Sequence, residues 1–197
     1  MKTLLRIDSS IRHTDSISRM MGDHFVSHWR KKHVNGRIIA RDLQVSPVPH
    51  LSQSTVQAFF SGKSTSDELA LSDLLIEEIT ISDELLITCP MYNFQIPSSL
   101  KAYFDHVVRV NKTFQHRNGD YVGMLKNKKC YLLTAMGGRK SNVNREEDFE
   151  SYLRNILGFI GIDDTLLYSM DGTANKDYVI TAIKEIKSKI INSIYIS

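Results

Sequence analysis

Between an apolar run and a helical pattern the chain reads Cys89-Pro90-Met91-Tyr92-Asn93-Phe94-Gln95-Ile96-Pro97-Ser98-Ser99-Leu100-Lys101. The apolar run, Leu85–Cys89, has the character of a buried strand, and an amphipathic helix begins near Leu100. In α/β sheets, ligands bind in the crevice where strands end and helices begin. An ordinary strand–loop–helix connection has no need of two aromatic residues and an Asn. We therefore expect this turn to contact a ligand, with a plain connection as the alternative.

The N-terminus has the second such connection. Thr3–Ile7 is a short apolar run, and apolar residues recur at every fourth position from Ile17 to Trp29, which predicts a helix. The loop between them is rich in hydroxyl and carboxyl groups. Ser16 or Ser18 can cap the helix, and a simple cap is the alternative interpretation. A hydroxyl-rich loop that leads into a helix N-terminus is also suited to binding a phosphate.

Strand-like and helical patterns alternate along the chain. The strand-like runs are Thr3–Ile7, Arg37–Ala40, Leu85–Cys89, Cys130–Ala135 and Thr165–Ser169. Apolar residues at helical spacing lie within residues 17–29, 69–79, 100–108, 149–160 and 179–194. Strands separated by helices indicate parallel βαβ units with right-handed crossovers. We expect one domain over residues 1–197, a three-layer flavodoxin-like α/β fold. Its five-stranded parallel sheet has the order 2-1-3-4-5, with helices on both faces.

Two segments interrupt this alternation. Gln44–Asp67 is rich in Ser, Thr, Gln and Pro, with one apolar patch at Val56, Phe59 and Phe60, and we expect a long loop there, of a length that is usually functional or interfacial. Residues 111–128 contain Asn118-Gly119, a strong hairpin signal. Solvent-exposed excursions are the alternative for both. The aromatic residues in these segments predict a partner surface or a lid over a ligand, and they are Phe59, Phe60, Phe114 and Tyr121.

Composition is that of an ordinary globular protein, with 42% hydrophobic and 24% charged residues. The net charge of +3 comes from interspersed charges, so we expect no nucleic-acid partner. No run approaches the roughly 18 apolar residues of a membrane span, and no signal peptide is evident. We expect no membrane association and, by default, a cytoplasmic location. Cys89 and Cys130 lie at opposite ends of neighbouring strands, so we expect reduced thiols.

A third loop, Thr134–Arg139, follows the fourth strand and contains Gly137-Gly138, which lets a backbone approach a flat ligand. In the expected sheet order, the first, third and fourth strands are neighbours, so their loops meet at one edge. The constellation of phosphate-binding hydroxyls, an aromatic–amide turn and paired glycines fits a phosphorylated planar cofactor, and FMN is the natural candidate. No Gly-x-Gly-x-x-Gly or Walker loop competes with it, and no His/Cys cluster has metal-binding spacing.

With these features, the chain resembles the bacterial FMN-dependent NADH-azoreductases, also described as NADH:quinone reductases, along nearly its whole length. The most specific block is Pro90–Phe94, followed by Ile96, Leu100-Lys101, Tyr103 and Asp105. The other matches are Ser9-Ser10-Ile11 with Ser16 and Ser18, Arg41-Asp42-Leu43, Thr113-Phe114 and Leu157-Gly158-Phe159-Ile160-Gly161.

The resemblance implies a homodimer with one FMN per subunit and active sites at the subunit interface. It places the phosphate on Ser10, Ser16, Ile17 and Ser18. It places the isoalloxazine ring on Pro90, Met91, Tyr92, Asn93 and Phe94, and on Ala135, Met136, Gly137 and Gly138. The chain departs from the family pattern at Ile17, Asn111, Ala135 and Met136. Backbone contacts survive such changes and side-chain contacts do not, so we expect an altered substrate preference.

The resemblance also implies an oxidoreductase that uses NADH to reduce quinones and aromatic azo compounds by two-electron, ping-pong hydride transfer through FMN. Asn93 and Phe94 are the candidate catalytic residues, acting through backbone N–H groups beside the flavin. Phe114 and Tyr121, with Phe159 of the same or of a partner subunit, would form an apolar substrate wall. The alternatives are a flavodoxin-type electron carrier and a flavin-binding redox sensor.

Overall fold

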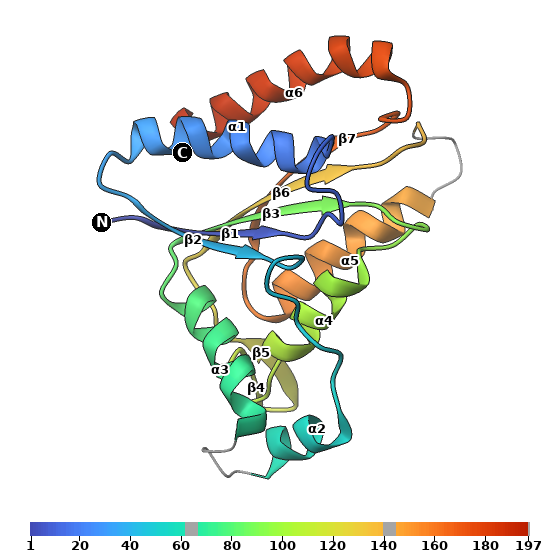
Figure 1. Cartoon of the computed structure of the whole chain (residues 1–197). Helices are drawn as coiled ribbons and strands as arrows, with labels where there is room; N and C mark the ends of the chain where they lie inside the picture. Colours follow the sequence, from blue (N-terminus) through green and yellow to red (C-terminus); the bar gives the residue numbers. More distant parts are fainter. Residues whose placement is uncertain (62–66, 140–144, 197) are drawn as a thin grey trace.

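The computed structural model describes residues 1–61, 67–139 and 145–196 (Figure 1). Its main sheet has five parallel strands in the order β2-β1-β3-β6-β7. The strands are β1 (Thr3–Asp8), β2 (Arg37–Asp42), β3 (Glu84–Pro90), β6 (Lys129–Ala135) and β7 (Asp164–Met170). Counted among these five strands alone, the order is the expected 2-1-3-4-5. The labels differ because β4 (Phe114–Arg117) and β5 (Asp120–Gly123) form a separate antiparallel hairpin.

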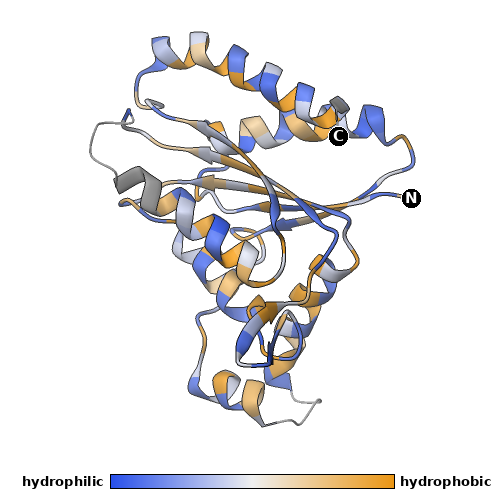
Figure 2. Cartoon of the chain, turned by 180° about the vertical axis from the view of Figure 1, so that it is seen from behind, coloured by the Kyte–Doolittle hydropathy of each residue, from blue (hydrophilic) through white to orange (hydrophobic). Residues whose placement is uncertain are grey.

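Helices cover both faces of this sheet (Figure 1). On one face lie α1 (Ile17–Lys32) and α6 (Lys176–Ile196), and on the other lie α3 (Asp67–Thr80), α4 (Ser98–Val107) and α5 (Arg145–Phe159). In Figure 2 the helices carry both hydrophobic and hydrophilic residues, as expected when one side of each helix packs on a sheet. The flavodoxin-like architecture follows from this arrangement of layers.

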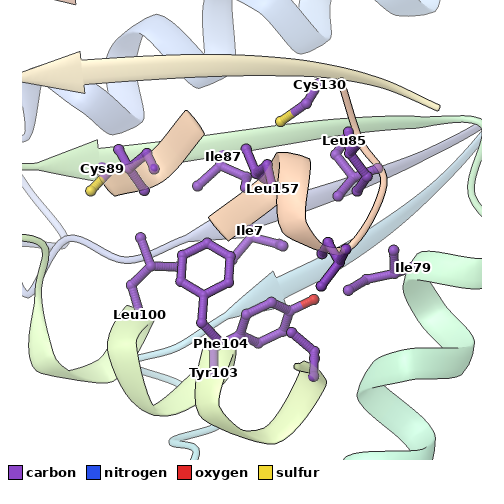
Figure 3. Close-up of a cluster of buried hydrophobic side chains, with 14 of the residues drawn as sticks. Ile7, Ile79, Leu85, Ile87, Cys89, Leu100, Tyr103, Phe104, Cys130 and Leu157 are labelled. Atoms are coloured by element: carbon purple, nitrogen blue, oxygen red, sulfur yellow. The ribbon is translucent and has the colours of Figure 1, made fainter. Parts of the chain in front are cut away.

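The central strands are buried on both faces. Every residue of β3 is buried, and its apolar side chains enter clusters on both faces: Leu85, Ile87 and Cys89 belong to one cluster and Leu86 to the other. Ile87 packs towards Leu100, Phe104 and Leu157 below the sheet (Figure 3). Leu86 packs with the α1 side chains above it. Cys89 and Cys130 are free, buried thiols whose pKa is raised by burial.

The expected strands and helices are confirmed to within a few residues at their ends, with one omission. The segment Gln44–Asp67 is not a continuous loop, because α2 (Gln53–Phe60) lies within it; residues 62–66 are outside the described part of the chain. Ser52 caps this short helix by accepting a hydrogen bond from the Thr55 N–H at 3.1 Å. Phe59 is half-buried against the His106 ring.

The hairpin predicted from Asn118-Gly119 is confirmed, with Phe114 opposite Gly123 and Arg117 opposite Asp120. Asn118 and Gly119 both have positive φ, as a tight hairpin turn requires. Tyr121 is 66% exposed, whereas Phe114 is half-buried against other aromatic rings. None of the described helices has the length and apolarity needed to cross a membrane.

Candidate functional site

A cavity of about 950 Å³ lies at the carboxyl ends of the strands. Nine of the residues predicted for the cofactor line it: Ser10, Ser16, Ile17, Ser18, Pro90, Met91, Tyr92, Ala135 and Gly137. Four other predicted residues are not among its described lining: Asn93, Phe94, Met136 and Gly138. Met136 is 1% exposed, so its side chain belongs to the protein interior rather than to the cavity.

Hydrogen bonds to β3 and to α1 hold the loop after β1 in place. Ser9 Oγ donates to the Thr88 carbonyl at 2.8 Å, which ties the loop to β3. Arg19 donates to the Ser10 carbonyl at 2.8 Å and makes two further bonds to the Asp42 carboxylate, at 2.6 and 2.9 Å. These bonds to Arg19 lower the pKa of Asp42. The loop and the start of α1 are therefore fixed to the end of β2.

The N-terminus of α1 opens into the cavity. Ser16 is the N-cap, and its Oγ accepts from the Arg19 N–H at 3.4 Å and lies 3.3 Å from the Ser18 hydroxyl. The first turn of an α-helix leaves N–H groups without partners in the helix, here those of Ile17 and Ser18. Together with the hydroxyls of Ser10 and Ser16, these groups form a donor set suited to an anion.

The turn after β3 is a tight two-residue reversal. Tyr92 and Gln95 exchange backbone hydrogen bonds of 2.9 and 3.0 Å, and Asn93 and Phe94 between them have φ values of 49° and 66°. This is the geometry of a type I′ turn. The Tyr92 hydroxyl lies 3.4 Å from Ser10 Oγ and accepts from the Ile11 N–H at 3.3 Å. The aromatic turn and the hydroxyl-rich loop thus meet, as the sequence predicts.

The loop Met136–Arg139, here called the glycine loop, closes the other side of the cavity. Its first carbonyls accept backbone hydrogen bonds from the segment after β7: Met136 from Thr173, Gly137 from Ala174 and Gly138 from Gly172, at 3.0, 3.2 and 2.7 Å. Among the described residues, no backbone carbonyl accepts a hydrogen bond from the Gly137 or Gly138 N–H. A Cβ on Gly137 would meet only the Ala174 Cβ, at 4.0 Å, and one on Gly138 would meet nothing within 4 Å.

These features fit FMN. The hydroxyls and the first turn of α1 suit a phosphate, the space beside Gly137 and Gly138 suits the edge of a flat ring, and Met91 and Tyr92 supply apolar contact. The sequence reasoning missed the contribution of the segment after β7, since Thr173, Ala174 and Lys176 also line the cavity. The signal was present: β7 neighbours β6, so a loop at its carboxyl end reaches the same edge.

The three aromatic residues predicted as a substrate wall contact one another, but their cluster lies outside the described lining of the cavity. The Phe114 ring centroid lies 4.7 Å from that of Phe159 and 5.9 Å from that of Tyr121. The cluster joins the hairpin to the end of α5, and none of the three is among the described residues that line the cavity. In this arrangement the cluster does not wall the cavity of its own chain.

The model of the family with a flavodoxin-like fold matches residues 1–194. The chain is 39% identical to the FMN-dependent NADH:quinone oxidoreductase of Hydrogenovibrio crunogenus, over 98% of this chain and 99% of that protein. It is 40% identical to the enzyme of the same name from Herminiimonas arsenicoxydans, over 88% and 89%. Among solved structures, an FMN-dependent NADH-azoreductase of Bacillus anthracis in complex with FMN aligns with a TM-score of 0.85 at 23% identity, covering 99% of this chain and 98% of that one.

Proposed function

This chain belongs to the flavodoxin-like family that includes the FMN-dependent NADH:quinone oxidoreductases, and from that premise we propose its reaction in detail. It is an FMN-dependent oxidoreductase that uses NADH to reduce quinones and aromatic azo compounds. The observation that supports this most directly is the cavity, which joins the N-terminus of α1, the Tyr92 turn and the glycine loop at one edge of the sheet. NADH and the electron acceptor would bind one after the other in the same part of the cavity, which gives a ping-pong order.

Each part of the cavity has a distinct task. Ser10, Ser16 and Ser18, with the Ile17 N–H, bind the phosphate. Pro90, Met91 and Tyr92 on one side, and the loop Ala135–Gly138 on the other, orient the ring. When bound, FMN supplies the hydride chemistry that the side chains lack. Asn93 and Phe94, which lie outside the described lining of the cavity, would act through the rigid turn that carries Tyr92, whose fixed backbone dipoles would stabilise developing negative charge without reorganising.

We further propose that residues 1–197 form a single FMN-binding domain that acts as a cytoplasmic homodimer. Support comes from the aromatic cluster of Phe114, Tyr121 and Phe159, which is close to the surface and outside the cavity of its own chain. In a symmetric dimer the same patch on each subunit can reach the partner's cavity. The cluster would then supply an apolar wall for flat substrates bound in the other subunit.

The visible spectrum of the purified protein, taken before and after anaerobic addition of NADH, tests this function. A bound flavin that bleaches with NADH and recovers its colour with a quinone is the expected result. A flavin that stays oxidised would instead favour an electron carrier or a redox sensor. A colourless protein that takes up no added FMN would overturn the cofactor assignment.

A further inference from the structure

The segment Asp171–Asn175, here called the support segment, underlies the glycine loop. It connects β7 to α6, and its backbone N–H groups hold three consecutive carbonyls of the glycine loop. The Thr173 hydroxyl adds a second bond to the Met136 carbonyl, at 3.0 Å. Because these bonds hold the carbonyl side of the loop, the position of Gly137 and Gly138 depends on the position of the support segment.

Two side chains clamp the same pair of segments together. The Arg139 guanidinium, from the end of the glycine loop, lies 4.3 Å from the centroid of the Tyr178 ring in the first turn of α6. Tyr178 in turn donates its hydroxyl to Asp171 Oδ1 at 3.1 Å, and its N–H bonds Asn175 Oδ1 at 3.1 Å. A cation over an aromatic face is attractive even at exposed sites.

Gly172 shows how closely this clamp is packed. Its φ is +65°, a conformation that glycine adopts without strain. A Cβ at this position would lie 3.0 Å from the Tyr178 ring and 3.1 Å from Arg139 Cγ, which is tighter than ordinary contact. Backbone bonds, the stacked pair and the absence of a side chain at Gly172 therefore define one arrangement of the two segments.

We propose that Arg139 and Tyr178 are positioning residues of the cofactor pocket, which hold Gly137 and Gly138 in the geometry that receives the flavin ring. This inference rests on the proposed function. Neither side chain is among the described residues that line the cavity, so their effect on a flavin passes through the glycine loop. The phosphate half of the pocket lies at the N-terminus of α1, whereas the contacts of Arg139 and Tyr178 given above join the glycine loop to the support segment and α6.

Comparing FMN with riboflavin separates the two halves of the pocket, because riboflavin has the ring but no phosphate. We expect Tyr178→Leu to raise the dissociation constants of both ligands by the same factor, about three- to tenfold, in fluorescence titrations of the apoprotein. Tyr195→Leu is the matched control, since Tyr195 lies on the same helix at its far end and is 50% exposed. It should leave both constants unchanged.

Variants of Arg139 keep the proposal testable if Tyr178→Leu does not fold. Arg139→Met should weaken both ligands, and Arg139→Lys should restore most of the loss, because a lysine can also stack its charge on the ring. At saturating FMN, Arg139→Met should change the visible absorption envelope of the bound flavin, whereas a variant that only destabilises the fold should not. The apoprotein melting temperature provides that comparison.

Three results would overturn the inference. The first is a loss of FMN affinity with riboflavin affinity unchanged. The second is an unchanged affinity and spectrum in Arg139→Met, and the third is an equal loss in Arg139→Met and Arg139→Lys. Each of these requires that the unmodified protein binds FMN. If the unmodified protein binds none, the proposed function fails instead, so the two failures are distinguishable.

Discussion

Two consecutive residues of the turn after β3, Asn93 and Phe94, have left-handed backbone conformations. Asn tolerates this region well, whereas Ala there costs roughly 1–2 kcal/mol. Asn93→Ala would therefore change the turn as well as remove the amide, and we expect it to lower the melting temperature by about 2–8 °C. Differential scanning fluorimetry measures this. An unchanged melting temperature would mean that the turn is not strained by alanine.

Asn93→Gly is the cleaner variant for function, because glycine keeps the positive φ and removes only the side chain. We expect it to retain FMN to within about twofold, since phosphate binding lies on α1. Reduction of the bound flavin by NADH should be slower if the Asn93 side chain helps to position the turn. Stopped-flow absorbance at saturating NADH gives the rate. Equal rates in the variant and the unmodified protein would show that the Asn93 side chain takes no part in flavin reduction and would leave the backbone role proposed above.

At the phosphate, Ser16 and Ser18 act as neighbouring hydroxyls on one helix end. Removing both, in Ser16→Ala combined with Ser18→Ala, should weaken FMN by at most a few kcal/mol, at about 1 kcal/mol per hydrogen bond. Part of any loss of stability will come from the N-cap, because Ser16 Oγ also accepts from the Arg19 N–H. Ultrafiltration of the loaded protein measures FMN retention. Riboflavin binding serves as the control and should not change.

On the scale of whole elements, β2 and α1 are joined by the paired hydrogen bonds from Arg19 to Asp42. The folded-state pKa of Asp42 is lowered, so this pair stabilises the fold above the unfolded pKa of about 3.9. The contribution is lost as the pH falls through the lower, folded value. Because Asp42 is partly exposed, we expect no more than about 1 kcal/mol from the pair.

Asp42→Asn should therefore lower the urea midpoint at pH 6 and have a progressively smaller effect below pH 4. Urea unfolding of both proteins across this range gives the comparison. Lys101→Gln is a suitable control, since Lys101 and Asp105 form a partly exposed ion pair within α4, on the other face of the sheet from α1. An Asp42→Asn effect of equal size at pH 6 and pH 3 would show that packing, rather than charge, is responsible.

The alternation of strands and helices was predictable because each element has its own periodicity and the central strands are apolar throughout. The helix α2 was not, since eight residues are too few to establish a helical period. It is held by its Ser52 cap and by Phe59, which lies against His106 and beneath Arg109. Those contacts come from distant parts of the chain, and no local pattern contains them.

Some parts of the candidate site were likewise predictable from the sequence and others were not. The loops after β1, β3 and β6 were identified because hydroxyls, aromatic residues and paired glycines are conspicuous in sequence. The strand order already places the end of β7 at this edge, but the support segment was missed because Asp171, Gly172 and Thr173 resemble any polar turn. Its role comes from hydrogen bonds to another loop, which sequence patterns do not report. Local chemistry was therefore predictable, whereas the contacts between loops required the fold.

On the scale of the whole molecule, the proposed dimer predicts that each active site draws on two subunits. A variant with a blocked pocket and a variant with a defective wall should then complement each other. Gly137→Leu blocks the pocket, because the space beside Gly137 is open towards the cavity. Phe159→Ala alters the wall, and Tyr121→Ala is a milder companion, since Tyr121 is 66% exposed.

Co-expression with two different tags allows the mixed dimer to be isolated. If the wall acts across the interface, the one open pocket of the mixed dimer faces an intact wall, and turnover should be about half that of the unmodified dimer. If the wall acts within one subunit, turnover should instead be half that of the Phe159→Ala homodimer. The flavin content, one per mixed dimer, checks the composition in both cases. Elution as a monomer in size-exclusion chromatography with light scattering would contradict the dimer itself, because an isolated subunit leaves the aromatic cluster with no cavity to face.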